Sequence, residues 1–374
     1  MFAFQPLIPS PLGKNLEDRA FELIEQCNEL KGSVHEVTAR GIGSLVQVIN
    51  CYYSNLIEGH RTTLKELEEA RKDFTFTLSK AHILTQMMAS NAIVTNPISA
   101  EFLSFLHREF FEKVPKEHRI LKNDSDSMVL ELIPGEFRTR AVKVGLHIPP
   151  EKSEEIQIYL NEWSATYTQL SNLPKVACLG AIHHRLLWIH PFLDGNGRVA
   201  RLLTDAVIRA LNLDHYGMWC LSRGLARRKD DYFKVLHTAD QERYNDVDGR
   251  GALSQKALIE CCEFFLETAL DQVHFMKKLY NLSHLDGRFK FLMHQLEMPL
   301  ENADMLSLIF SRGSIGRGEF ARLYPGKKER YARNQLSSLL QEGLLTSDTP
   351  KGEVRLAWPL KHLGLLMPQL LEVS

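Results

Sequence analysis

A stretch of twelve residues, HPFLDGNGRVAR at positions 190–201, contains a histidine, an acid, two glycines around an asparagine and two arginines. Helical patterns on both sides place it on a turn between two helices. Glycine allows successive backbone N–H groups to point into one concavity, and the start of a helix binds phosphate. The stretch therefore predicts a phosphate site at Gly195, Asn196 and Gly197.

The charged residues of the same stretch suit a polyphosphate. Arg198 and Arg201 share one face of the following helix, so both guanidinium groups can reach a ligand at its start. A carboxylate beside phosphates, here Asp194, can hold Mg²⁺. His190 titrates near neutrality and can accept a proton from an attacking hydroxyl. Each residue alone has an ordinary structural explanation, but no packing requirement accounts for the set.

The stretch resembles the Fic signature, HPFxDGNGRxxR, and matches every fixed position of it. The resemblance implies a mainly α-helical Fic fold and transfer of AMP from ATP, with Mg²⁺, to a Ser, Thr or Tyr hydroxyl of a target protein. The related Doc branch phosphorylates instead and usually carries lysine where Gly197 stands, so nucleotidyl transfer is favoured. The implied roles are general base for His190, Mg²⁺ ligand for Asp194, α- and β-phosphate cradle for Asn196, Gly197 and Arg198, and γ-phosphate contact for Arg201.

Two flanking segments extend the resemblance. FRTRAVKVG at 137–145 resembles the flap, a hairpin that covers the nucleotide and pairs with a target segment by strand addition, with Val144 and Gly145 as nucleotide contacts. DDYFKVLHTAD at 230–240 resembles the helix that closes over adenine, with Tyr232 and Asp240 as contacts. The family often has asparagine where Asp240 stands. From the residue pattern alone, the 137–145 segment fits an ordinary hairpin equally well. The same pattern fits Tyr232 as a core residue.

An inhibitory motif of the same family, [ST]xxxE[GN], is matched by SNLIEG at 54–59. Ser54 and Glu58 lie on one face of a helix, and Gly59 suits its end. The resemblance implies that Glu58 pairs with Arg201 and withholds it from the γ-phosphate, which leaves ATP in an unproductive pose. Because the motif precedes the signature, the chain resembles the N-terminally inhibited class of Fic proteins.

The elements that must position these residues suggest three consecutive parts. We expect an N-terminal helical region at 1–112, with a capping box at Thr63 and Glu66, and a catalytic core at 113–280 with a short strand or hairpin within 133–150. A linker near 281–290 leads to a C-terminal unit at 285–374.

The C-terminal unit has the helix, turn, helix, hairpin order of a winged helix-turn-helix domain. Its local excess of basic residues suits DNA, with the helix from Lys328 in a major groove and the hairpin at Lys351 on the backbone. Winged helices also dock proteins or form dimers, so this alternative stays open. The basic residues are Arg317, Arg322, Lys327, Lys328, Arg330 and Arg333.

Composition limits the remaining classes. The 374 residues are 44% hydrophobic with a net charge of −1, so no strong overall field attracts nucleic acid or membranes. Six cysteines without CxxC spacing, and no apolar run long enough to span a bilayer, predict a cytoplasmic protein with reduced thiols. The expected partners are ATP and a protein with a hydroxyl side chain, while DNA and a homodimer stay open.

Two other functions fit the same residues. The site could remove AMP from modified proteins, with Glu58 positioning a water molecule. Alternatively, the chain could be a DNA-binding regulator that senses ATP as a ligand. Turnover distinguishes the regulator, which needs bound nucleotide but no catalytic His190.

Overall fold

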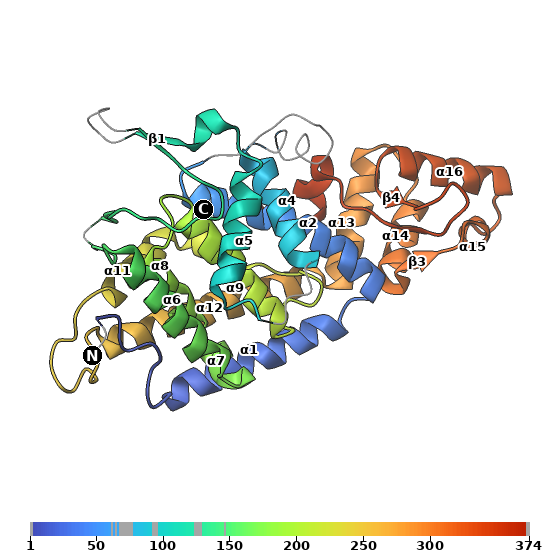
Figure 1. Cartoon of the computed structure of the whole chain (residues 1–374). Helices are drawn as coiled ribbons and strands as arrows, with labels where there is room; N and C mark the ends of the chain where they lie inside the picture. The colour runs from blue at the N-terminus through green and yellow to red at the C-terminus, as the bar shows by residue number, and fades with distance from the viewer. Residues whose placement is uncertain are drawn as a thin grey trace. The chain divides into compact units, whose positions relative to one another are not determined.

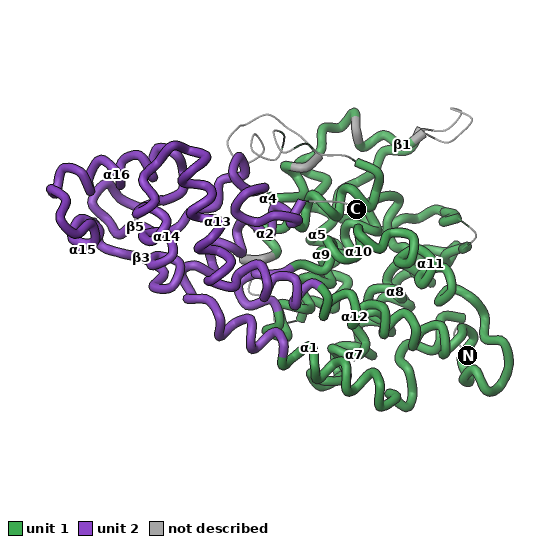
Figure 2. The backbone as a smooth tube through the Cα atoms, turned by 180° about the vertical axis from the view of Figure 1, so that it is seen from behind, with its two compact units in different colours: residues 1–25, 50–213, 220–271 green, residues 26–49, 214–219, 272–374 purple. Residues whose placement is uncertain are grey.

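The computed structural model describes residues 3–60, 63, 66, 78–91, 96–122, 129–145 and 147–371. It is mainly helical, as the sequence predicts (Figure 1). The chain forms two compact units: unit 1 comprises 1–25, 50–213 and 220–271, and unit 2 comprises 26–49, 214–219 and 272–374 (Figure 2). This division does not follow three consecutive segments, because α1 (Lys14–Gly32), α2 (Glu36–Ile57) and α12 (Gln255–Leu279) each contribute residues to both units.

Unit 1 is built around two helices that flank the 190–201 stretch. Helix α8 packs against α6 and α9, and α9 also packs against α4 and α5. Nearly every residue of α8 is buried, so the helix passes through the interior rather than along a surface. Besides the parts of α1, α2 and α12, the helices among the described residues of this unit are α4 (Leu78–Asn91), α5 (Ala100–Phe111), α6 (Ser153–Thr168), α7 (Asn172–Ala177), α8 (Leu179–Ile189), α9 (Asn196–Ala210), α10 (Leu221–Arg227) and α11 (Lys229–Ala239).

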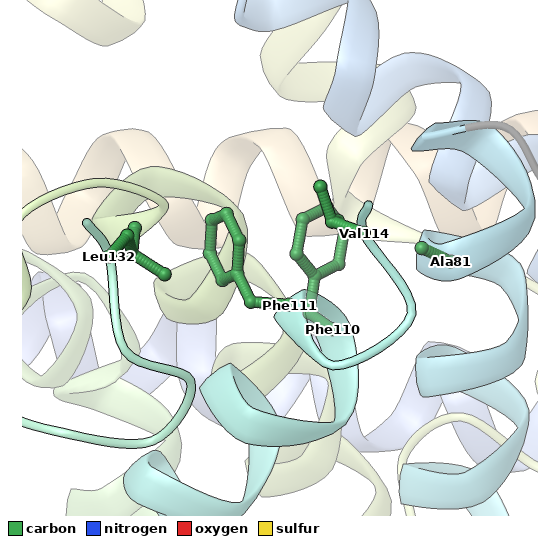
Figure 3. Packing of buried hydrophobic residues seen from close by; sticks show 5 residues of the cluster. All are labelled: Ala81, Phe110, Phe111, Val114 and Leu132. Atoms are coloured by element: carbon green, nitrogen blue, oxygen red, sulfur yellow. The ribbon is translucent and has the colours of Figure 1, made fainter. Parts of the chain in front are cut away.

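A compact aromatic cluster lies at the end of α5 in unit 1. Phe110 and Phe111 at the end of α5 pack with Ala81, Val114 and Leu132 (Figure 3). All five side chains are almost completely buried. Close packing of these buried apolar side chains stabilises the end of α5. Helix α5 in turn packs against α9, which carries the two arginines of the signature.

The strands of unit 1 differ from expectation. A short 3-10 helix, Lys116–Arg119, leads into β1 (Ile120–Lys122), which pairs antiparallel with β2 (Val129–Glu131) in a register that places Ile120 opposite Glu131. This pair was not predicted. The strand or hairpin expected within 133–150 is reduced to one antiparallel bridge between Val144 and His147, and residues 137–143 have no regular structure.

Unit 2 contains the expected helix, helix, strand, turn, strand order. Helix α13 (Leu282–Gln295) packs on α14 (Glu301–Arg312), and α15 (Arg317–Arg322) packs on α16 (Glu329–Gln341). The antiparallel sheet has the order β3–β5–β4, with β3 at Ser314–Ile315, β4 at Leu345–Thr346 and β5 at Val354–Leu356. A 3-10 turn, Leu360–His362, and α17 (Leu363–Leu366) follow.

The prediction of a linker near 281–290 is wrong, because helix α13 begins within these residues. The Asn281 side chain caps this helix by accepting a hydrogen bond from the Ser283 N–H at 3.1 Å. Leu285, Phe289 and Leu292 then recur at helical spacing and are buried. Polar residues between these positions obscured the periodicity.

Three smaller expectations can be compared directly. The capping box is confirmed, because the Thr63 N–H donates to Glu66 Oε2 at 2.6 Å and the Glu66 N–H donates to Thr63 Oγ1 at 3.2 Å. The helix expected in TTLKELEEARK at 62–72 lies outside the described residues, apart from Thr63 and Glu66. All six cysteines are buried and free. No helix in the described ranges is long and apolar enough to cross a membrane.

Helices α8 and α12 approach closely at Gly180, which predicts an effect on stability. A Cβ at this position would lie 2.6 Å from the Cys261 carbonyl oxygen and 2.8 Å from the Cys262 Cα, and backbone cannot yield as a side chain can. We expect Gly180→Ala to lower the free energy of unfolding by about 1–3 kcal/mol. Thermal denaturation followed by circular dichroism measures the change.

Gly287 in α13 provides the matched control, since an added Cβ there meets nothing within 4 Å. Gly287→Ala should stabilise by about 0.4–1 kcal/mol through reduced freedom of the unfolded chain. Equal effects of the two substitutions would contradict the close approach at Gly180.

Candidate active site

His190 is the first residue after α8, and its backbone is left-handed with φ 50° and ψ 60°. The imidazole Nδ1 lies 3.3 Å from the Leu187 carbonyl oxygen. A carbonyl only accepts, so Nδ1 carries the proton and Nε2 is left as a proton acceptor. Burial lowers the pKa of His190 to about 4. The ring is therefore a neutral base at physiological pH.

Arg138, which the sequence did not single out, holds this strained turn. Its side chain is buried and donates to the carbonyl oxygens of His190 at 2.7 Å and Ile189 at 3.3 Å. It also donates to the carbonyls of Arg140 and Pro150, at 2.8 Å and 2.7 Å. One cation thus ties the end of α8 to residues 137–150, and these inward bonds explain why that segment does not form an extended hairpin.

The loop after His190 is closed by Asn196. Its side-chain Oδ1 accepts the Phe192 N–H at 2.9 Å, and its Nδ2 donates to the Phe192 carbonyl at 2.8 Å. Gly195, with φ 82°, completes the turn into α9. The Asn196 side chain therefore shapes the loop, whereas a phosphate would meet the backbone N–H groups that open α9, which have no partner within the helix.

Asp194 is accessible beside this helix start. Its side chain is 47% exposed; Oδ1 accepts the Gly195 N–H at 2.6 Å, and Oδ2 lies 3.4 Å from Arg198 Nη2. No group of three or more His, Cys, Asp or Glu side chains that could hold a metal occurs in the described ranges. A metal at Asp194 would therefore take most of its ligands from water and substrate oxygens, which is the habit of Mg²⁺.

Arg198 is buried on the aromatic cluster, yet one of its donors is unused. Its guanidinium carbon lies 5.0 Å from the centre of the Phe110 ring and 5.9 Å from that of Phe111. Arg198 Nε has no hydrogen-bond partner among the described residues. A buried, unsatisfied guanidinium N–H next to a helix start suits an anionic oxygen.

Arg201 meets the predicted inhibitory motif. Arg201 Nη2 donates to Glu58 Oε1 at 2.6 Å, so the predicted ion pair is present. Arg201 Nε donates to Ser54 Oγ at 2.8 Å, and Nη2 donates to the Ser54 carbonyl at 3.0 Å. Burial opposes charge on both partners, but the attraction between them lowers the pKa of Glu58 and raises that of Arg201.

Glu58 also lies against the start of α9. A Cβ built on Gly197 would collide with Glu58 Oε1, so this carboxylate and the backbone of Gly197 are in contact. Helix α2 ends here, since Gly59 has φ 83° and the Gly59 and His60 N–H groups donate to the Leu56 and Asn55 carbonyls, both at 3.0 Å. Glu58 therefore takes a place suited to anions, although the carbonyl end of its own helix disfavours negative charge.

The two expected adenine contacts have other neighbours in this structure. Tyr232 is 1% exposed, and its hydroxyl lies 2.8 Å from His183 Nε2. Asp240 Oδ1 lies 3.0 Å from His184 Nε2. Contact of either residue with adenine stays a prediction.

The two flap residues expected to contact nucleotide, Val144 and Gly145, lie at the surface. Val144 is 39% exposed and forms the bridge with His147, while Gly145 has φ 59°. His147 Nε2 lies 2.8 Å from the Trp188 carbonyl of α8. The flap segment is therefore attached to α8 both here and through Arg138, and its expected nucleotide contacts stay predictions.

Comparisons with known proteins agree with the helical fold and the signature. Residues 97–208 match the model of the Fic/DOC family. The chain is 26% identical over 199 residues to protein adenylyltransferase Fic of Drosophila erecta, covering 52% of this chain and 39% of that protein. It is 38% identical over 77 residues to the protein of that name from Drosophila willistoni, covering 20% of this chain and 15% of the relative.

Among solved structures, Fic-1 from C. elegans has a TM-score of 0.51 at 14% identity, over 70% of this chain and 72% of that one. The first curated relatives are matched over about two fifths of their length. The chain has the mainly helical Fic fold with small antiparallel sheets. Residues 97–208 are thus similar to the Fic/DOC family, and the chain is distantly similar to proteins named protein adenylyltransferase Fic.

The buried state of His190 predicts its titration. We expect histidine-ring NMR signals of His190 to titrate near pH 4 and to stay unchanged between pH 5 and 8, because burial disfavours the imidazolium. The unfolded value is near 6.5, so the folded state binds fewer protons between these limits. The contribution of the neutral His190 ring to the free energy of unfolding therefore rises with pH from about 4 and is complete above 6.5. It is lost on acidification.

The His190→Asn variant assigns the signal. A His190 midpoint near 6.5 would contradict the buried, neutral ring.

Proposed function

We propose that this chain is a protein adenylyltransferase that transfers AMP from ATP to a Ser, Thr or Tyr hydroxyl of a target protein. The observation that carries the proposal is the neutral base at His190 placed one short loop before a helix start with two buried arginines. The names of the distant relatives support nucleotidyl transfer as the reaction class.

Each residue has a defined task in this reaction. His190 Nε2 accepts the hydroxyl proton as the oxygen bonds to the α-phosphorus of ATP and pyrophosphate leaves. The N–H groups that open α9 and the free Nε of Arg198 bind phosphate oxygens, and Arg201 binds the γ-phosphate. Asp194 would hold Mg²⁺, which would neutralise phosphate charge. Arg138 keeps His190 oriented by fixing the carbonyls of the turn.

Glu58 inhibits this reaction in our proposal. Its carboxylate occupies the α9 helix start and pairs with Arg201, so it competes with the terminal phosphate of ATP for the same positive groups. ATP bound beside Glu58 would lack the γ-phosphate contact that aligns the α-phosphate with His190. The motif at 54–59 lies before the signature, as in the N-terminally inhibited class.

Removal of AMP from a modified protein uses the same groups in a different order. A carboxylate beside the cleaved phosphate can position a water molecule, and the Glu58 carboxylate, which lies against Gly197, would take this role. Transfer and removal differ in their dependence on Glu58, because only removal requires it.

Substitution of Glu58 tests the inhibition. Glu58→Gly should raise AMP transfer roughly 10- to 100-fold, the range expected when one charge-assisted hydrogen bond that competes with substrate is lost. Glu58→Gln keeps the side-chain shape without its charge and should fall between wild type and Glu58→Gly. Intact mass after incubation with ATP and Mg²⁺ measures AMP added to the protein itself or to a supplied target.

His190→Ala in the Glu58→Gly background is the control for catalysis and should abolish the adduct. Unchanged or lower transfer in a well-folded Glu58→Gly protein would disprove inhibition. An added phosphate instead of AMP would assign the protein to the kinase branch. Loss of AMP from a modified protein that requires Glu58 would favour removal.

A second candidate function is DNA binding by a winged helix within unit 2. It rests on two exposed basic side chains that form no ion pair in the described part of the chain. Helix α16 buries Ala332, Leu336 and Leu339, so its opposite face is open. Arg333 pairs with Glu329 at 2.6 Å, whereas Lys328 and Arg330 are exposed and pair with no acid in the described part of the chain. In a helix-turn-helix, basic residues at the start of the second helix can contact phosphates beside the major groove.

Charge reversal tests this candidate. Lys328→Glu/Arg330→Glu should weaken duplex DNA binding, and the wild-type affinity should fall as salt rises, because bound counterions are released. Lys152→Glu/Lys256→Glu is the control with the same charge change in unit 1. Fluorescence anisotropy of a labelled duplex measures binding. Equal loss in both variants, or no binding at low salt, would leave protein docking or dimerisation as the role of this unit.

A further inference from the structure

A four-residue turn at 133–136 precedes the flap segment, and its geometry requires glycine. The N–H of its last residue donates to the carbonyl of its first at 3.2 Å, and Gly135 has φ 83°. Proline followed by glycine at the two central positions is typical of a type II turn. A Cβ on Gly135 would lie 3.0 Å from Arg108 Cβ and 3.2 Å from the Ser104 carbonyl oxygen. The turn therefore packs directly against α5.

Two side chains of α5 hold the polar backbone groups of Gly135. The Gly135 N–H donates to His107 Nδ1 at 2.8 Å, and Ser104 Oγ donates to the Gly135 carbonyl at 2.6 Å. Ser104 and His107 are three positions apart on α5, so they project to the same side of the helix. A backbone N–H only donates, so His107 Nδ1 is the acceptor, and in the neutral ring the proton is on Nε2.

His107 also supports the loop that follows His190. Its ring centre lies 4.0 Å from that of Phe192, and the two ring planes differ by 6°. Both side chains are buried, and Asn196 binds the backbone N–H and carbonyl of Phe192. One histidine thus contacts the turn at 133–136 through a ring nitrogen and the loop after His190 through its ring face.

The turn held by His107 leads within three residues to Arg138. The Arg138 backbone N–H donates to the Pro191 carbonyl at 2.9 Å, and its side-chain Nε donates to the His190 carbonyl at 2.7 Å. Three residues of extended chain span only about 10 Å, so the place of Gly135 restricts the place of Arg138. A shift of the turn away from α5 would therefore move the group that holds the His190 backbone.

We propose that His107 is a positioning residue for the reaction at His190. By accepting the Gly135 N–H, it fixes the turn that places Arg138, and Arg138 holds the His190 backbone. The proposal rests on the proposed function for the identity of the reaction, but not for this series of contacts. A buried histidine on α5, outside the 190–201 stretch, thus determines how well the base is aligned.

Two substitutions separate this role from simple packing. His107→Asn keeps an acceptor, because the asparagine Oδ1 takes the place of Nδ1, but it loses the ring that packs on Phe192. His107→Phe keeps a flat ring on Phe192 but leaves the buried Gly135 N–H without this acceptor. A packing role predicts that His107→Phe is the milder change, whereas positioning through Gly135 predicts that His107→Asn is.

The rate of AMP addition tests this order in full-length protein carrying Glu58→Gly. Intact mass over a range of ATP concentrations gives kcat and the KM for ATP. His107→Phe should lower kcat roughly 10- to 100-fold, the effect of one unsatisfied buried donor, and His107→Asn by less than about fivefold. The KM for ATP should stay within about threefold in both, because the phosphate-binding groups belong to α9. A His107→Phe protein at least as active as His107→Asn would overturn the proposal.

Thermal unfolding of the same variants provides the control for folding. His107→Phe retains more buried aromatic area and should be at least as stable as His107→Asn. The expected order of stability is therefore opposite to the expected order of activity. A general folding defect would instead make the less stable variant the less active one, which would contradict the positioning role.

The titration of His190, followed by NMR, gives a readout that does not depend on ATP. In the wild-type chain and in His107→Asn, we expect a midpoint near pH 4. In His107→Phe, the displaced turn exposes the ring to water, and the midpoint should move up toward 6.5. An unchanged midpoint in His107→Phe would overturn the proposal. No AMP addition by any variant, with the midpoint displaced as expected, would refute the proposed reaction and leave the positioning role of His107 standing.

Discussion

The charge of Arg201 is the constraint on which the site depends. A guanidinium that is 3% exposed needs hydrogen-bond acceptors on every side, because an unpaired buried charge costs several kcal/mol. Ser54 of α2 and Glu58, which directly follows this helix, supply these acceptors. They lie 147 and 143 residues before Arg201 in the sequence. The site therefore requires the end of α2 to lie beside the start of α9.

The residues of the candidate site could be predicted wherever the chemistry is local in sequence. The 190–201 stretch carries its base, acid, glycines and arginines within twelve residues, and Gly59, with positive φ, follows the end of α2 as the sequence indicates. The pairing of Glu58 with Arg201 required the family resemblance, because nothing in either segment points to the other. Arg138 and His183 escaped prediction for the same reason: each has partners about 50 positions away, His190 for Arg138 at 52 and Tyr232 for His183 at 49, and a single arginine or histidine gives no periodic signal.

The fold could be predicted where apolar spacing is regular. The helices on both sides of the signature and the short helices of unit 2 follow that spacing, whereas α13 was missed because polar residues separate Leu285 from Phe289. The short strands β1 and β3 have only three and two residues, too few for an alternating pattern. The β-branched residues of 137–143 predict a strand. The hydrogen bonds that the buried Arg138 side chain donates to backbone carbonyls hold the segment in another conformation.

The attachment of Glu58 to the end of α2 has a consequence for how strongly it can compete. A carboxylate held on the same chain is an intramolecular ligand, and its strength is an effective concentration set by the geometry of α2 rather than by the amount of protein. Dilution leaves such a ligand in place, and the low exposure of Arg201 limits screening of the pair by salt. The carbonyl end of α2 disfavours the charge of Glu58, which weakens this internal ligand and brings its strength closer to that of an external anion.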